Sequence, residues 1–175
     1  MPDKSDDITI KYGTNANDKD VTAFSLVVLK DILRTAGLSS ALISSTARSP
    51  AQQARVMYNN IVAKGVAAQK KLYAAAGDAV IDVYVKSKTA KKSPDQIKAD
   101  MEAKIIELGP TSVSHHAADP KVLNVFDVAP SSIGDKKAFE LAVSKEKRVS
   151  KFLLPPNDPG YHLEIPQPPA EQPES

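Results

Sequence analysis

The chain contains no cysteine among its 175 residues. It can therefore form neither a disulfide framework nor a thiolate metal site, and any bound metal must rest on nitrogen and oxygen ligands. Its net charge is also small, +2 from 23 basic and 21 acidic side chains that are interspersed along the chain. Without long basic blocks, nucleic acid is not the favoured partner.

The sequence also lacks a recognisable signal peptide and a membrane anchor. The N-terminal run Met1–Asp7 has an acidic balance and no apolar segment directly behind it, unlike a Sec signal peptide. The longest apolar stretch, Val21–Leu33, is interrupted by Lys30 and Asp31 and is too short to span a bilayer. We therefore expect no membrane insertion, and any role outside the cytoplasm requires another route of export.

Size and composition predict one compact domain with a tail. At 42% hydrophobic residues, a chain of this length can bury a sizeable core without splitting. The Pro-rich end, Pro166–Ser175, has too few apolar groups to offset the entropy cost of ordering. We predict a single domain over residues 1–165 and a disordered tail over 166–175.

Hydrophobic spacing and capping residues predict mostly helices in the first two thirds of the chain. Residues 66–88 are rich in alanine and favour a helix, although the β-branched run Ala79–Val85 leaves a strand open. Three other helices are predicted. The first contains the apolar stripe within Val21–Leu33, with Asp20 or Thr22 as N-cap and Gly37 as terminator. The second runs from Ser49-Pro50 to Gly65, and the third from the capping box Ser93–Gln96 to Gly109-Pro110.

Short apolar runs predict strands, mainly in the last third of the chain. Ala41–Ser45 is an early strand, and Asn124–Val128 and Tyr161–Ile165 are two later ones, separated by a helix over Lys136–Ser144. The expected fold class is α+β, with helices packed on a small, mostly antiparallel sheet.

The three histidines of the chain occur in two short runs, Ser114–His116 and Tyr161–Glu164. Asp127 lies between them in an apolar run, where a carboxylate is expected to be buried and to need a partner. Two imidazoles and one carboxylate leave the fourth tetrahedral position of a zinc ion open for water, which is typical of catalytic zinc. The pattern predicts metal-assisted hydrolysis.

These runs resemble the zinc peptidases that include D-alanyl-D-alanine carboxypeptidases, phage L-alanyl-D-glutamate endolysins and Hedgehog-type domains. Ser114-His115-His116 matches the family's Ser-x-His motif, Phe126–Val128 its aspartate strand and Tyr161–Leu163 its last ligand strand. Upstream, Ser44–Gln53 is similar to the family's arginine-containing turn, which leads into a helix bearing a glutamine. The four motifs occur in the family's order.

The resemblance implies that His116, Asp127 and His162 bind Zn²⁺ on the predicted sheet, with His115 as the alternative to His116. A general base must then accept a proton from the attacking water. Asp158 matches the family's upstream acid better, whereas Glu164 is two residues from His162 and shares its strand face. Both remain candidates, and Asp158 in Asp158-Pro159-Gly160 also fits an ordinary turn.

The resemblance also implies a catalytic or substrate-binding role for three further residues. Arg48 would stabilise the oxyanion or bind a substrate carboxylate, a task suited to its fixed fork of donors. Its position just before Ser49-Pro50 equally fits a plain helix-start residue. Ser114 and Gln53 are the expected substrate-binding side chains.

The implied function is hydrolysis of a peptide bond in the stem peptide of bacterial peptidoglycan, by an endopeptidase or carboxypeptidase. Such a protein, an endolysin or cell-wall-degrading effector, would act as a monomer in the periplasm or cell wall. Without a signal peptide it would be made in the cytoplasm and released by a holin or a secretion machine. The alternative is a non-catalytic domain of the same fold that binds a cell-wall peptide or a protein and carries a structural zinc.

Overall fold

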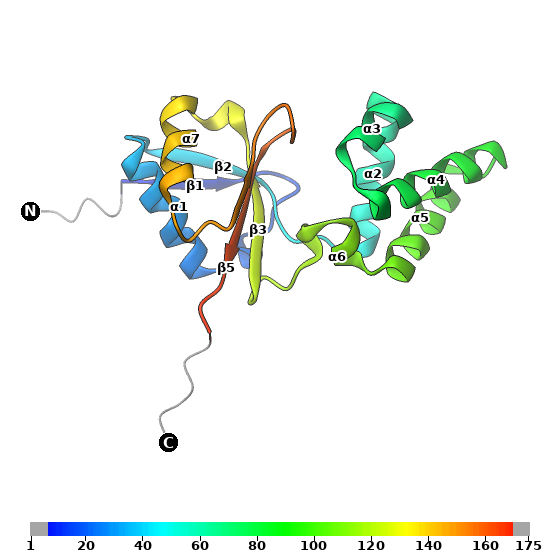
Figure 1. Ribbon diagram of the computed structural model, residues 1–175, viewed down its shortest axis with the longest axis horizontal. Helices are drawn as coiled ribbons and strands as arrows, with labels where there is room; N and C mark the ends of the chain where they lie inside the picture. The colour runs from blue at the N-terminus through cyan, green and yellow to red at the C-terminus, as the bar shows by residue number, and fades with distance from the viewer. Residues whose placement is uncertain (1–6, 170–175) are drawn as a thin grey trace, which may run out of the picture. The chain divides into compact units, whose positions relative to one another are not determined.

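The computed structural model describes residues 7–169 and confirms the α+β class (Figure 1). Its contacts divide the chain into two compact units. The sheet unit comprises the residues up to Ala47 and those from Asp119 onward, and the helical unit comprises Arg48–Ala118. Whether the two units behave as the single domain predicted over residues 1–165 stays a prediction.

The sheet unit contains five strands in the order β1-β2-β3-β5-β4. Within residues 7–169, only the β1–β2 pair is parallel, so the sheet is mostly antiparallel, as predicted. The three predicted strands are present, whereas β1 and β4, of four and three residues, were not predicted. The bounds are β1 Thr9–Tyr12, β2 Ser40–Ser45, β3 Leu123–Val128, β4 Lys151–Leu153 and β5 Tyr161–Pro166.

Two helices, α1 (Ala23–Thr35) and α7 (Lys136–Lys145), pack on one face of this sheet (Figure 1). Thr22 caps α1, as one of the two alternatives predicted. The strands send alternate side chains to the helices, and the paired residues Phe126 and Leu163 are fully buried there. The core of the sheet unit also includes Val28, Leu29, Ile32, Leu33, Ile43, Val128, Phe139, Val143, Tyr161 and Ile165.

A buried amide that the sequence did not single out connects β3 to the start of α1. Asn124 is fully buried, its Nδ2 donates to the carbonyl of Asp20 at 2.7 Å, and its Oδ1 accepts from the backbone N–H of Thr22 at 3.0 Å. These bonds satisfy backbone groups at a helix start, where the first N–H groups have no partner within the helix. Asn124 thereby fixes α1 against the central strand of the sheet unit.

The helical unit has its own hydrophobic core. Ser93 forms the predicted capping box with Gln96, and Ser49, the predicted N-cap, forms a second one with Gln52. Gly65 and Gly109 end the two helices, as predicted. Residues 66–88 form two helical segments, so the helix favoured for this stretch over a strand is confirmed. The bounds are α2 Pro50–Lys64, α3 Val66–Leu72, α4 Ala75–Thr89, α5 Pro94–Leu108 and α6 Pro110–Val113, and the core is Ala54, Met57, Ile61, Val80, Ile81, Tyr84, Ile97, Met101, Ile105 and Val113.

The first residues of the predicted tail are ordered. Pro166 ends β5, and the backbone N–H of Gln167 donates to the carbonyl of Val122 at 3.0 Å. The Gln167 side chain also donates to Ser25 Oγ at 3.1 Å. The disordered tail predicted over residues 166–175 is therefore wrong for Pro166 and Gln167, because both bond to the sheet unit, and residues 170–175 lie outside the described part of the chain.

Among residues 7–169, no helix has the length and apolar character needed to cross a bilayer.

Candidate metal centre

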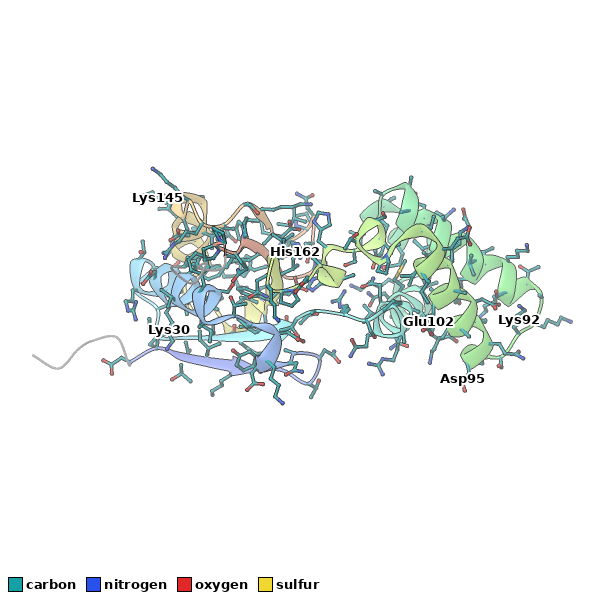
Figure 2. All side chains as sticks on the ribbon, turned by 90° about the horizontal axis from the view of Figure 1, so that it is seen from below. Lys30, Lys92, Asp95, Glu102, Lys145 and His162 are labelled. Carbon is teal, nitrogen blue, oxygen red and sulfur yellow. The ribbon has the colours of Figure 1, made fainter. Side chains whose placement is uncertain are left out.

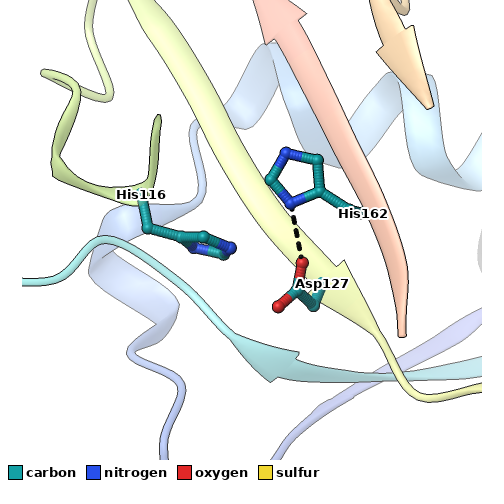
Figure 3. A group of neighbouring side chains, drawn as sticks. All are labelled: His116, Asp127 and His162. Carbon is teal, nitrogen blue, oxygen red and sulfur yellow. Dashed lines mark hydrogen bonds and ion pairs between the residues drawn. The ribbon is translucent and has the colours of Figure 1, made fainter. Parts of the chain in front are cut away.

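Asp127 and His162 lie directly opposite each other in the antiparallel pair β3–β5. Asp127 Oδ1 is 3.0 Å from His162 Nδ1, and the two side chains are only 16% and 8% exposed (Figure 3). The predicted aspartate and the predicted last histidine are thus brought into contact by strand register, across 35 positions of sequence.

The same register explains why both side chains leave the hydrophobic core. Their neighbours Phe126 and Leu163 point to the helix-covered face, so Asp127 and His162 point to the opposite face. Next to them β2 is irregular: Ile43 pairs with Val128, but Ser45 pairs with Asp127. Such bulges redirect side chains and are frequent beside functional sites. Here the irregularity places a serine backbone beside the aspartate.

Glu164 is the second carboxylate in contact with His162. Its Oε1 lies 2.9 Å from His162 Nε2, and its side chain is 6% exposed. The two residues share one face of β5 because they are two positions apart. Each ring nitrogen of His162 therefore faces a different carboxylate.

Figure 2 shows His162 within the sheet unit, whereas the side chain of Lys145, at the end of α7, extends away from that unit.

The surroundings of His162 act on its pKa in opposite directions. Burial alone lowers the pKa, because it disfavours the imidazolium, whereas the hydrogen bonds to Asp127 and Glu164 raise it. The charges of Asp127 and Asp158 raise it further, and the net result is a pKa above the ordinary 6.5. The two carboxylates at the ring, together with the charge of Asp158, therefore outweigh desolvation in favouring the imidazolium.

His116 belongs to the helical unit, in the short 3-10 helix η3 (His115–Ala117). Ser114 Oγ accepts the N–H of His116 at 3.3 Å, and the His116 carbonyl accepts the N–H of Arg48 at 2.8 Å. His116 is buried and His115 is exposed. This difference favours His116 over the alternative ligand His115.

His116, Asp127 and His162 form a candidate metal-binding group. Each offers one ligand atom, and these atoms all lie within 4.8 Å of one another (Figure 3). Tetrahedral zinc with bonds of about 2.0–2.2 Å needs ligand atoms about 3.3 Å apart. The 3.0 Å between Oδ1 and Nδ1 is close to this spacing. The donors fit a metal by chemistry and spacing, and imidazole with carboxylate suits several divalent metals besides zinc.

Asp158, the first candidate base, forms a turn before β5. Its Oδ1 accepts the N–H of Gly160 at 2.9 Å, which is the ordinary turn role that the sequence left open. A Cβ added at Gly160 would meet both Asp127 Cβ and Asp158 Oδ1, at 3.7 and 3.9 Å. Gly160, whose backbone Asp158 bonds, therefore lies beside Asp127.

Arg48 and Gln53 contact each other within the helical unit. Arg48 Nη1 donates to Gln53 Oε1 at 3.3 Å, and Gln53 Nε2 lies 3.4 Å from the hydroxyl of Tyr73. Gln53 is only 1% exposed, so its amide is occupied in orienting Arg48 and Tyr73. Direct substrate binding by Gln53 stays a prediction, as does that by Ser114, whose hydroxyl oxygen caps η3.

Thr46 is a buried residue near this region that the sequence reasoning missed. It is 1% exposed, its Oγ1 donates to Asp20 Oδ2 at 3.3 Å, and it accepts the N–H of Asn17 at 2.9 Å. These bonds fix the exit of β2, two residues before Arg48. In the sequence, Thr46 could have been singled out only by its position in the polar segment directly after the predicted strand Ala41–Ser45.

No protein-family model, curated protein or solved structure matches this chain.

Proposed function

We propose that the protein binds Zn²⁺ through His116, Asp127 and His162 and hydrolyses peptide bonds. One observation carries the proposal: two imidazoles and one carboxylate present ligand atoms within 4.8 Å of one another. Three protein ligands of this kind leave a coordination position for water, as in catalytic zinc sites. The absence of cysteine is consistent with a nitrogen and oxygen site.

When bound, zinc would supply a Lewis acid and lower the pKa of water to about 7. Asp158 or Glu164 would accept the proton of the attacking water and deliver it to the leaving amine. The guanidinium of Arg48 would bind the oxyanion or a substrate carboxylate with its planar donors. Its contact with the buried Gln53 supports this role, because a restrained side chain loses less entropy on binding.

The proposed substrate is the stem peptide of bacterial peptidoglycan. Support comes from the resemblance of the motifs around Arg48, His116, Asp127 and His162, in that order, to those of zinc peptidases of the cell wall. On this proposal the protein acts in the periplasm or cell wall as a monomer, after release by a holin or a secretion machine. Both an endopeptidase and a carboxypeptidase are compatible with the residues.

Metal analysis of single variants tests the site. The protein is stripped with a chelator, re-equilibrated with zinc, desalted and analysed by mass spectrometry. We expect about one zinc per chain in the wild type, as for an open three-ligand site, and loss of zinc in His116→Ala, Asp127→Ala and His162→Ala. His115→Ala is the matched control, because His115 is exposed in the same short helix. A wild type without stoichiometric metal would refute the proposal.

Digestion of purified peptidoglycan tests the reaction. The zinc-loaded protein should release fragments whose masses identify the broken bond: loss of D-alanine for a carboxypeptidase, and separation of the stem peptide for an endopeptidase. His162→Ala should release none. Zinc-loaded protein that sediments with peptidoglycan but cleaves nothing would instead support the alternative, a binding domain with a structural zinc.

A further inference from the structure

His162 is held by two carboxylates from opposite edges of its ring. Asp127 Oδ1 is 3.0 Å from Nδ1, and Glu164 Oε1 is 2.9 Å from Nε2. An imidazole binds a metal through one nitrogen, and its other N–H usually donates to a carboxylate, carbonyl or water that fixes its tautomer. One carboxylate is therefore expected to share the metal with His162, and the other to orient the ring.

The composition of the candidate group assigns these two roles. Asp127 belongs to the group with His116 and His162, whereas Glu164 does not. The metal therefore faces the Nδ1 edge of the ring, on the Asp127 side. The Nε2 edge, on the Glu164 side, keeps its proton and donates it in a hydrogen bond.

Glu164 is placed for an orienting role by its position in the sheet. Its strand β5 pairs with β3 on one side and β4 on the other, so its backbone is hydrogen-bonded at both edges. The N–H of Ser150 donates to the Glu164 carbonyl at 2.9 Å, and the Ser150 hydroxyl to the same oxygen at 3.2 Å. A carboxylate on a backbone this constrained holds its partner ring in one orientation.

We propose that Glu164 is a positioning residue that fixes the tautomer and orientation of His162 and strengthens its bond to the metal. This inference rests on the proposed zinc site. It removes Glu164 from the candidates for general base, because its carboxylate accepts the Nε2–H of His162. Asp158 is then the carboxylate that exchanges protons with the attacking water.

The first test is nitrogen NMR on wild-type protein labelled with ¹⁵N-histidine and loaded with zinc. We expect one of the three imidazoles to show a metal-bound Nδ1 and a protonated Nε2, and its signals to disappear in His162→Gln. A metal-bound Nε2 on His162 would overturn the inference. This measurement needs no substitution at Glu164, so a folding defect cannot obscure it.

The second test is zinc affinity, measured by competition with a chromophoric chelator. Removing the carboxylate in Glu164→Ala should weaken binding by about 10–100-fold, the usual effect of losing such a partner. Glu164→Gln, whose amide oxygen still accepts the Nε2–H, should lose less. Glu102→Gln, in α5 of the helical unit, is the control that should bind zinc as the wild type does.

The outcomes separate this inference from the proposed function. A wild type that binds no zinc refutes the zinc site itself. Wild-type zinc affinity in both Glu164 variants, with hydrolysis abolished, overturns the positioning role and makes Glu164 the base. Complete loss of zinc in Glu164→Gln, with binding retained in Asp127→Asn, also overturns it, because Glu164 would then be the ligand.

Discussion

Asp127 Oδ1 and His162 Nδ1 are 3.0 Å apart because their residues are direct partners in the β3–β5 register. Paired residues in an antiparallel sheet point to the same face, and a slip of one position would move one of them to the other face. The core-facing pair Phe126 and Leu163 opposes such a slip, because it would expose the member of the pair on the shifted strand. Burial of the hydrophobic core thus holds the polar pair in position.

Asp127→Asn should separate metal binding from folding. The amide oxygen keeps the shape and can contact His162, but it lacks the charge that makes a carboxylate a strong ligand. We expect zinc affinity to fall at least about 10-fold, with little change in the thermal unfolding of the metal-free protein. Asp82→Asn, at an exposed position of α4, is the control. Equal zinc affinity in Asp127→Asn and the wild type would show that Asp127 is not a ligand.

Asp158→Asn should abolish hydrolysis while zinc is retained. An asparagine oxygen can still accept the N–H of Gly160, so the turn before β5 is preserved. It cannot take up a proton, and loss of a general base costs about 10²–10⁴-fold in rate. Fragment release from peptidoglycan, followed by chromatography at equal zinc occupancy, measures the effect. A fully active variant would exclude Asp158 as the base.

Asn124→Ala should destabilise the sheet unit without touching the metal ligands. The substitution leaves the N–H of Thr22 and the carbonyl of Asp20 without the side chain that bonds them. Unsatisfied buried polar groups cost about 1–3 kcal/mol each, so we expect a loss of about 2–3 kcal/mol in the free energy of unfolding. Urea denaturation of this variant beside Asn59→Ala, at an exposed position of α2, provides the comparison. A loss below about 0.5 kcal/mol, the range of surface substitutions, would contradict this role.

The ion pairs of Arg148 predict a pH dependence of stability. The hydrogen bond from Arg148 lowers the pKa of Glu146 against an opposing effect of burial, and Arg148 also contacts Asp31 of α1 at 2.9 Å. A lowered pKa in the folded state stabilises the protein above the ordinary value of 4.5, and this contribution is lost as the pH falls through the lowered pKa. Stability should therefore decline in acid from about pH 4.5 downward.

Arg148→Gln should remove this acid sensitivity at a small cost near neutral pH. We expect a loss of about 0.2–1 kcal/mol at pH 7, typical of partly exposed ion pairs, and a smaller difference from the wild type below pH 4. Urea denaturation at several pH values measures both. Lys104→Gln, which breaks the Lys104–Glu107 pair at 3.1 Å, is the control. An equal difference at pH 7 and pH 3 would mean that the effect of Arg148 is packing alone.

Helix ends were predictable from the sequence because their causes are local. Ser49 and Ser93 cap helices whose third residues, Gln52 and Gln96, complete the capping boxes, and these contacts span only three positions. The short strands β1 and β4 were missed because three or four residues carry too little periodicity, and their partners lie elsewhere in the chain.

The donors of the candidate site were also visible in the sequence, but their arrangement was not. Three histidines, an aspartate in an apolar run and a glutamate two positions from His162 defined the available chemistry. Strand alternation alone placed Glu164 beside His162, and the contact at 2.9 Å agrees. That Glu164 faces one ring nitrogen while Asp127 faces the other could not be deduced, because it requires the register of two strands.

The sequence by itself determined the elements that depend on neighbouring residues: helix caps, strand alternation and the kinds of ligand available. Only the tertiary structure decided that Asp127 meets His162, that His116 is buried and His115 exposed, and that Asn124 bonds the start of α1. The physical reason is the distance along the chain over which each kind of interaction acts. Caps and alternation are set by interactions over a few residues, whereas register and burial are set by packing of the whole hydrophobic core, to which distant segments contribute together.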